Sequence, residues 1–393
     1  MKIMAVNAGS SSLKFQLLEM PSEKLLLSGI IERIGFADSI FTVKYLDKKE
    51  KEVFSIPNHS VAVELLLKKI VETKVVKSLE EIVGVGHRVV HGAELFKDSV
   101  LIDDEVIRKI ESVSDLAPLH NPANLTGIFA FNKALPNTKS VAVFDTAFHQ
   151  TMKQTEYIYS VPYEWYTKYG VRKYGFHGTS HKYVSLRAAK LIGKKVEDAK
   201  IIVCHIGNGA SLCAVKGGKS IDTSMGFTPL SGIAMGTRSG DIDPAIVQYI
   251  SQKENETLDQ VINDLNKKSG YLGLSGFSSD SRDLWEAVEK GDKRSTLAVE
   301  KQAKMIADYI GAYFLVLNGC DAICFTAGIG ENASETRQLV VEKIKALGVK
   351  LDRVENAKKG IEKIISTKDS KIKVLSIPTN EEVMIARDTL RLI

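Results

Sequence analysis

The chain has 393 residues, of which 44% are hydrophobic and 26% are charged, and its formal net charge is +5. This length and composition predict a folded protein of about two domains. The positive charge is not gathered into a basic tail or stripe, and no apolar run reaches the length of a membrane span, so neither a nucleic-acid partner nor a membrane is expected.

The four cysteines lie inside or beside apolar runs. This placement predicts core thiols in a reducing compartment. The apolar start of the chain, residues 1–6, is too short for a secretory signal. We therefore expect a cytoplasmic protein.

Apolar runs alternate with segments of helical periodicity along the whole chain, which predicts layered α/β structure. The expected strands are 41–45, 81–87, 140–144, 201–204, 322–325 and 371–377. The charged run 48–52 (KKEKE) predicts a solvated turn. Helix starts are expected at Asn121, which would cap the helix before Pro122, and at the cap pairs Asn332 with Glu335 and Thr379 with Glu382.

Three glycine-rich turns each follow an apolar run: 7–12 (NAGSSS), 205–211 (HIGNGAS) and 327–332 (AGIGEN). The first two lead directly into a second apolar strand, so these two units look like copies of one another. Glycine lets the backbone approach an anion closely, and free N–H groups in such turns bind phosphate. The pattern predicts a duplicated fold that binds the phosphates of a nucleotide, and hence a phosphotransferase.

Five polar clusters stand at the ends of apolar segments, where α/β proteins place their chemistry. They are Arg88 in 86–92 (GHRVVHG), His120 in 118–122 (PLHNP), Asp145 in 144–149 (FDTAFH), His177 in 174–181 (YGFHGTSH) and Arg238 in 236–241 (GTRSGD). Each cluster alone is as well explained by a structural role. Their joint occurrence indicates an active site.

These clusters, together with 7–14 (NAGSSSLK) and 378–382 (PTNEE), resemble the acetate kinase family over essentially the whole chain. Ile206 stands where Leu is frequent and Ala93 where a second Gly is frequent, and neither departure removes a polar group. The family belongs to the superfamily of sugar kinases, Hsp70 and actin. The resemblance thus implies an α/β fold with a two-domain duplicated ribonuclease H-like core. The polar run 150–156 predicts the boundary between an N-terminal domain of 1–149 plus helix 383–393 and a nucleotide-binding domain of 150–382.

The resemblance implies reversible phosphoryl transfer between ATP and acetate, giving acetyl phosphate and ADP. It also implies dependence on Mg²⁺, which Mn²⁺ could replace, and a homodimer. One alternative is a propionate or butyrate kinase of the same family. Another is a non-catalytic nucleotide switch like actin or Hsp70, which would leave Arg88, His177 and Arg238 without a role.

Roles for individual residues follow from the resemblance as well. Arg88 would bind the acetate carboxylate, Arg238 and His177 would stabilise the transferring phosphoryl group, and His120 would assist from the phosphate side. The methyl group would lie against Val90, Leu119, Phe176 and Pro229. Mg²⁺ would be held by Asn7 and Glu381.

The nucleotide would be bound by the glycine-rich turns and one further segment. The residues implied are Ser10, Ser12, Lys14, His205, Ile206, Gly207, Asn208, Gly209, Asp280, Ser281, Arg282, Gly328, Ile329, Gly330, Glu331 and Asn332.

Asp145 is also expected among the catalytic residues, but its role needs a chemical argument. A carboxylate substrate with a pKa of roughly 4 to 5 is already ionised at neutral pH. No proton has to be removed from it, so a general base is not required. We predict that Asp145 orients Arg88 or metal-bound water. Similarly, Glu382 is expected to serve the helix cap, which leaves Glu381 for the metal.

Overall fold

The computed structural model describes residues 1–393. The chain forms two compact units, Met1–Phe148 with Asn380–Ile393, and His149–Thr379. The boundaries expected from the sequence, 149/150 and 382/383, lie one and three residues from these. None of the helices has both the length and the apolar character that crossing a membrane requires.

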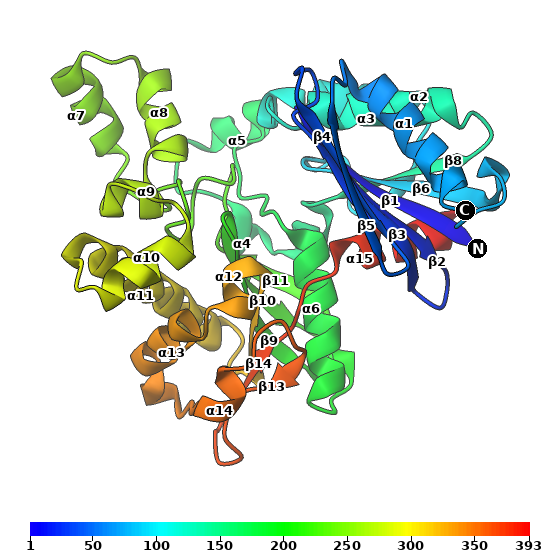
Figure 1. Ribbon diagram of the computed structural model, residues 1–393. Helices are drawn as coiled ribbons and strands as arrows, with labels where there is room; N and C mark the ends of the chain where they lie inside the picture. Colours follow the sequence, from blue (N-terminus) through cyan, green and yellow to red (C-terminus); the bar gives the residue numbers. More distant parts are fainter. The chain divides into compact units, whose positions relative to one another are not determined.

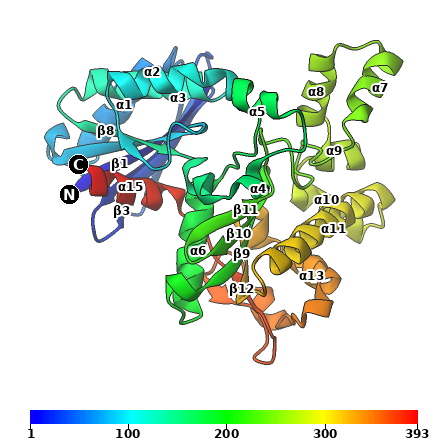
Figure 2. The ribbon, with the colours of Figure 1, turned by 180° about the vertical axis from the view of Figure 1, so that it is seen from behind.

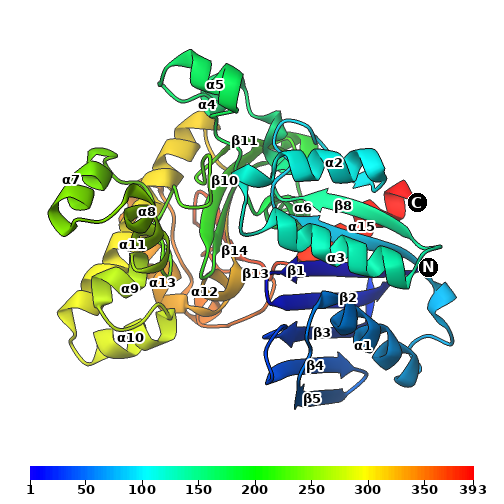
Figure 3. The same cartoon turned by 90° about the horizontal axis from the view of Figure 1, so that it is seen from above.

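The first unit is built on one eight-stranded sheet with the order β5-β4-β3-β2-β1-β6-β8-β7 (Figures 1 and 3). Neighbouring strands from β1 to β5 are antiparallel, whereas β1, β6 and β8 are parallel. The strands are β1 (Lys2–Gly9), β2 (Ser12–Glu19), β3 (Lys24–Glu32), β4 (Ser39–Tyr45), β5 (Lys48–Phe54), β6 (Ile82–Val89), β7 (Val100–Leu101) and β8 (Lys139–Phe144).

The helices of this unit are α1 (His59–Glu72), α2 (Asp104–Ser112), α3 (Asn121–Ala134) and α15 (Glu381–Leu392). Residues of β6 alternate between two helices, because successive side chains of a strand point to opposite faces. The ring of His87 packs on Phe131 of α3, with 5.5 Å between the ring centroids. A Cβ on Gly86 would instead lie 2.3 Å from Thr389 Oγ1 of α15. Helices α3 and α15 therefore cover opposite faces of β6.

The second unit contains a six-stranded sheet with the order β11-β10-β9-β12-β14-β13. The strands are β9 (Lys200–Ile206), β10 (Ala210–Lys216), β11 (Lys219–Thr223), β12 (Ala322–Thr326), β13 (Lys363–Ile364) and β14 (Lys373–Ser376). Strands β11, β10 and β9 pair antiparallel, and β9, β12 and β14 are parallel.

Helices α6 and α11 lie on opposite sides of this sheet (Figures 1 and 2). The helices are α4 (Gln154–Tyr157), α5 (Tyr163–Tyr169), α6 (Gly178–Leu191), α7 (Ala245–Glu254), α8 (Leu258–Lys267), α9 (Gly270–Ser275), α10 (Ser281–Glu289), α11 (Lys293–Val316), α12 (Ala327–Asn332), α13 (Ser334–Lys343) and α14 (Arg353–Asn356).

The two sheets share one topology. In the first, the order β3-β2-β1-β6-β8 consists of an antiparallel meander followed by two parallel strands, and β11-β10-β9-β12-β14 repeats this arrangement in the second. The first glycine-rich turn connects β1 to β2, and the second connects β9 to β10, so the two turns lie in equivalent hairpins. The predicted fold class, α/β with a duplicated core, is confirmed.

The charged run 48–52 is not a turn, as we had expected, but the start of strand β5. This strand pairs with β4 on one side only, at the edge of the sheet. Charged side chains protect such an edge from pairing with another chain. A run of alternating charges is thus compatible with an edge strand as well as with a solvated loop.

The three helix-cap predictions are wrong. Asn121 is already inside α3, whose N-cap is His120. Asn332 ends α12, and α13 begins after Ala333 without a side-chain cap. Helix α15 is capped by Asn380, whose side chain accepts a hydrogen bond from the Val383 N–H. The side chains of Asn121, Asn332 and Glu382 are used elsewhere.

Because Gly86 lies against α15, we expect Gly86→Ala to destabilise the protein. The added methyl group would lie 2.4 Å from Ile385 Cγ2 and 3.2 Å from the Ile385 carbonyl oxygen, so α15 would have to shift. Overpacking of this kind costs roughly 1–3 kcal/mol. Urea denaturation followed by circular dichroism measures the loss.

The matched control is Gly311→Ala in α11, where a Cβ meets no atom within 4 Å. An alanine in a helix interior is favoured over glycine by about 1 kcal/mol. The control variant should not lower the urea concentration at the midpoint of unfolding. An unchanged midpoint in Gly86→Ala would contradict the close packing of β6 on α15.

Candidate active site

Two candidate residues of the first unit meet at the ends of neighbouring parallel strands. Arg88 of β6 lies opposite Val143 of β8, and Asp145 follows β8 directly. The Asp145 N–H donates to the Val89 carbonyl oxygen at 3.0 Å, which continues the sheet by one residue. Arg88 Nε and Nη2 then donate to the two carboxylate oxygens of Asp145 at 2.8 and 2.6 Å. This is the two-pronged pairing that a guanidinium makes best.

The charges around this pair are nearly balanced. Burial disfavours the cation of Arg88, but the charge of Asp145 and its hydrogen bonds outweigh burial and raise the pKa of Arg88. Burial is also the largest cause that raises the pKa of Glu381, which lies near Arg88, Asp145, Glu382 and Lys14. Lys14 forms an ion pair with Glu382. The cluster holds three carboxylates and two cations, so it could accept one more cation.

The loop after β6 is fixed by two asparagines of α3. Asn121 accepts a hydrogen bond from the His91 N–H at 3.1 Å and donates to the His91 carbonyl oxygen at 2.9 Å. Asn124 accepts from the Val90 N–H and donates to the Ala8 carbonyl oxygen. These two side chains link the Arg88 strand to the end of β1. We did not predict this role, because Asn121 looked like a helix cap.

The other candidate residues of the first unit differ in exposure. Asn7 is half-buried on β1, opposite Lys14 on β2. Ser10 is exposed, and Ser12 begins β2. Val90 is 7% exposed, whereas Leu119 is 72% exposed and is not packed within its unit.

His177 has an unusual backbone in the second unit. It is the N-cap of α6 and has a φ of 57°, in the left-handed region that residues other than glycine rarely adopt. Its ring stacks on His205, with 4.2 Å between the centroids. Its Nδ1 is 2.9 Å from Ser211 Oγ. Strained backbone of this kind is often found at functional sites.

Arg238 lies beside His177 at the second glycine-rich turn. A Cβ on Gly209 would lie 3.4 Å from Arg238 Nη1 and 3.7 Å from His177 Nε2. The guanidinium donates to the Pro229 carbonyl oxygen at 3.4 Å and is half-buried. Burial lowers the pKa of Arg238, and no carboxylate offsets this effect. A half-buried cation without a counter-ion is well suited to bind an anion.

The glycine-rich turns of the second unit line a cavity of about 840 Å³, a size typical of small-molecule sites. Eight of the predicted nucleotide residues line it: Gly207, Asn208, Asp280, Ser281, Arg282, Gly328, Ile329 and Asn332. Seven further residues were not predicted: Ser279, Trp285, Glu286, Glu289, Ala333, Glu335 and Lys359. These come mostly from α10 and α13, where their spacing is that of ordinary surface helices.

The remaining predicted nucleotide residues of this unit lie outside the cavity lining. His205 and Ile206 end strand β9. Gly209 faces Arg238 and His177. The Glu331 carboxylate accepts a hydrogen bond from the Thr379 N–H at 3.0 Å.

Two residues predicted to contact the methyl group also lie in the second unit. Phe176 is buried and Pro229 is half-buried.

The backbone of Gly330 is bound by Arg337, a residue that we did not predict. Arg337 is fully buried, and its Nη1 donates to the Gly330 carbonyl oxygen at 2.8 Å. The same guanidinium donates to the side chain and the backbone carbonyl oxygen of Asn356. Burial lowers the pKa of Arg337 to about 10. Arg337 therefore ties the third glycine-rich turn to α14.

We expect Gly236→Ala to weaken nucleotide binding. A Cβ at this position would lie 1.8 Å from Asn208 Oδ1, so the cavity-lining Asn208 would have to move. Ser279 would also be crowded, since its carbonyl oxygen lies 3.2 Å from the same point. Overpacking of this size should raise the Kd for ADP about tenfold or more.

The fluorescence of Trp285 can report this binding, because Trp285 lines the cavity. The second tryptophan, Trp165, is 48% exposed and can be replaced by Phe to isolate the signal. Gly311→Ala again serves as the control. An unchanged Kd for ADP in Gly236→Ala would mean that the position of Asn208 does not affect nucleotide binding.

Comparisons with known proteins agree along the whole chain. The model of the acetokinase family matches residues 2–387. A protein named acetate kinase from Bacillus velezensis is 61% identical over 391 residues, covering 100% of this chain and 99% of its own length. Another from Bacillus subtilis is 60% identical, with the same coverage.

Two solved structures are similar as well. The structure of Porphyromonas gingivalis acetate kinase has a TM-score of 0.95 and 45% identity, and the comparison covers 100% of this chain and 99% of that one. A propionate kinase from Francisella tularensis has a TM-score of 0.94 and 43% identity over the full length of both chains. With a family model over nearly every residue and relatives at about 60% identity, this chain belongs to the acetokinase family.

Proposed function

We propose that this protein is an ATP:acetate phosphotransferase, which transfers the γ-phosphoryl group of ATP reversibly to acetate and gives acetyl phosphate and ADP. The observation that carries the proposal is the match to proteins named acetate kinase at about 60% identity over the full chain. In the cell, the protein would be a cytoplasmic homodimer. Sedimentation of the purified protein tests the dimer.

In this proposal the acetate carboxylate binds to Arg88. Its Nε and Nη2 already donate to Asp145, so Nη1 and the second hydrogen of Nη2 remain for a substrate. Asp145, at 1% exposed, holds the guanidinium plane in place and keeps its charge compensated. Acetate is ionised at neutral pH, so Asp145 acts as a positioning residue and not as a base.

The phosphoryl group would be stabilised by Arg238 and His177. During transfer, a bond forms between an acetate oxygen and the γ-phosphorus while the bond to the ADP oxygen breaks. Negative charge spreads over the three equatorial oxygens, and donors that are already in place lower the barrier. Arg238 has no carboxylate partner, so no ion pair has to break before it binds the phosphoryl group. The ring of His177 is held in place by its contacts with Ser211 and His205. His120, the N-cap of α3, would assist from the phosphate side.

Mg²⁺ fits the residues near Arg88. No three His, Cys, Asp or Glu side chains gather into a metal site by themselves. Mg²⁺ usually binds one or two carboxylates and keeps water and phosphate ligands, so Glu381 and Asn7 suffice as protein ligands. The excess of one carboxylate in this cluster favours a cation. When bound, Mg²⁺, or Mn²⁺ in its place, neutralises the phosphate charge.

Acyl phosphate formation tests the proposal directly. We expect purified protein with ATP, acetate and Mg²⁺ to form acetyl phosphate, trapped with hydroxylamine, and chelation of the metal to abolish it. In a series of acids, kcat/KM should fall from acetate to propionate to butyrate. A maximum at propionate or butyrate would favour the longer acids. Nucleotide binding with no acyl phosphate from any acid would indicate a nucleotide switch.

Arg88→Ala should raise the KM for acetate about tenfold to a hundredfold and lower kcat, because charge-assisted hydrogen bonds to the carboxylate are lost. Arg88→Lys should recover only part, since a point charge does not match the planar fork. The KM for ATP should change little. A wild-type KM for acetate in Arg88→Ala would refute the assignment.

This variant needs a stability control, because it leaves the buried carboxylate of Asp145 without its partner. The double variant Arg88→Ala with Asp145→Asn removes both charges. If the single variant is unstable and the double variant is stable but still has a high KM for acetate, the effect on acetate belongs to Arg88 and not to misfolding.

Arg238→Ala and His177→Ala should lower kcat by about 10² or more, with smaller changes in the KM for ATP, because their contacts strengthen only as charge develops. His177→Asn is a useful companion, since asparagine tolerates a left-handed backbone. Arg238→Ala should not lower the melting temperature, because no ion pair is broken. Near-normal kcat in either alanine variant would make that residue structural.

A further inference from the structure

A serine hydroxyl joins two histidines of the second unit. Ser211 of β10 is fully buried, and its Oγ is 2.9 Å from His177 Nδ1 and 2.8 Å from His181 Nε2. His181 is also fully buried. Its other nitrogen, Nδ1, has no hydrogen-bond partner. The positions of the hydrogens along these hydrogen bonds can therefore be found by asking which arrangement leaves no buried N–H or O–H without an acceptor.

The hydroxyl of Ser211 has a single hydrogen and can give it to only one of the two rings. If it donates to His181, then His181 carries its hydrogen on Nδ1, where a buried N–H would have no acceptor. If both rings donate to Ser211, the hydroxyl hydrogen has no acceptor, because the two rings are the hydrogen-bond partners of Ser211 Oγ. If Ser211 donates to His177 and His181 Nε2–H donates to Ser211, both fully buried residues use every hydrogen and only a lone pair on His181 is left over. The Nε2–H of His177 then belongs to a ring that is only half-buried.

Buried donors without a partner are rare in folded proteins, rarer than acceptors that lack a bond. The third arrangement is therefore the favoured one. Burial, together with the nearby rings of His149 and His205, also lowers the pKa of His181 well below its usual value. His181 thus stays neutral and carries a single N–H.

We propose that His181 and Ser211 are positioning residues that fix the neutral ring of His177 in the form with its hydrogen on Nε2. The proposal rests on the function proposed above, in which His177 acts on the phosphoryl group. Nε2 is the atom that lies with Arg238 beside Gly209. Through this chain, His177 offers an N–H to a phosphoryl oxygen without having to be protonated.

The test reads the hydrogen position directly. Protein labelled with ¹⁵N in its eight histidines is studied at about pH 7.5 by two-bond ¹H–¹⁵N correlation, well above the usual imidazole pKa of about 6.5. We expect Nδ1 of His177 to be of the unprotonated type and Nε2 of the protonated type. The same form is expected for His181. His177→Asn and His181→Gln assign the two signals.

Two variants at His181 separate positioning from packing. His181→Leu removes the donor, so kcat should fall about fivefold, the value of one ordinary hydrogen bond, with unchanged KM values. His181→Gln restores an N–H near Nε2 and should return kcat to within about twofold of wild type. If both variants lose kcat equally while folded, the donor is not what matters.

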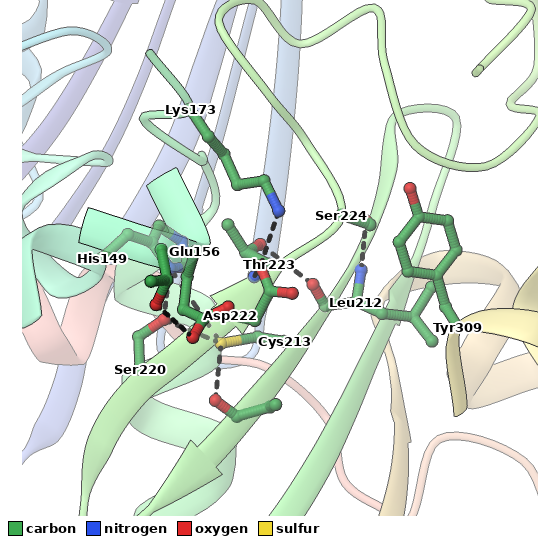
Figure 4. A network of polar contacts seen from close by, with 12 residues as sticks. His149, Glu156, Lys173, Leu212, Cys213, Ser220, Asp222, Thr223, Ser224 and Tyr309 are labelled. Carbon is green, nitrogen blue, oxygen red and sulfur yellow. Dashed lines mark hydrogen bonds and ion pairs between the residues drawn. The ribbon is translucent and has the colours of Figure 1, made fainter. Parts of the chain in front are cut away.

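Ser220→Ala is the matched control. Ser220 of β11 is also fully buried, and its hydroxyl is 2.8 Å from His149 Nδ1. Figure 4 shows these two side chains beside Cys213. This variant removes a serine–histidine hydrogen bond of the same kind but leaves His177 and His181 alone. It should change neither kcat nor the His177 signals.

The spectrum of the wild-type protein decides the proposal even if the His181 variants do not fold, because His177→Asn alone assigns the His177 signals. A His177 ring with its hydrogen on Nδ1, or a protonated ring at that pH, would overturn it. The spectrum does not depend on acyl phosphate formation. Failure of the proposed function and failure of this inference are therefore distinguishable.

Discussion

The parallel register of β6 and β8 is the constraint on which the proposed acceptor site depends. It brings Arg88 beside the residue that follows β8, and Asp145 continues the sheet by its bond to Val89. Neither charge could be buried alone without a large cost, whereas together they form two short hydrogen bonds. The ion pair and the strand register therefore require each other: a slip of one residue would turn Arg88 to the opposite face of the sheet.

The duplicated topology places polar groups at the same kind of position in the second unit. His205 lies opposite Thr326 at the ends of parallel strands β9 and β12, and the third glycine-rich turn follows directly. The two units use this equivalent edge of their sheets differently. The first builds a compensated ion pair, whereas the second leaves the guanidinium of Arg238 without a carboxylate and places beside it the ring of His177, which stacks on His205. The same arrangement of strands thus supports two kinds of charge environment.

Sequence reasoning found the parallel strands β6, β8, β9, β12 and β14 because buried parallel strands are apolar runs, but it took the charged edge strand β5 for a turn. It found the polar clusters because these follow the strand ends directly. It did not find roles that depend on tertiary contacts. Asn121 looked like a helix cap but binds the backbone of His91. Glu382 also looked like part of a cap, but it pairs with Lys14, far away in the chain. Arg337 has nothing in its local sequence to distinguish it from a surface arginine of a helix, yet it is fully buried beneath Gly330.

The contrast among the three arginines separates binding from support. Arg88 is paired with a carboxylate, so the substrate that we propose binds there would meet directed N–H groups with little net charge. Arg337 is buried among carbonyl oxygens and an amide, where its hydrogen bonds are satisfied and its pKa is lowered to about 10. Arg238 has neither a carboxylate nor a full set of carbonyl partners, and it is the one that lies at a glycine-rich turn beside an imidazole. This environment supports the proposal that an anion binds to Arg238. A phosphoryl group would suit the site better than a monovalent carboxylate, because it presents more negative oxygens to the same guanidinium.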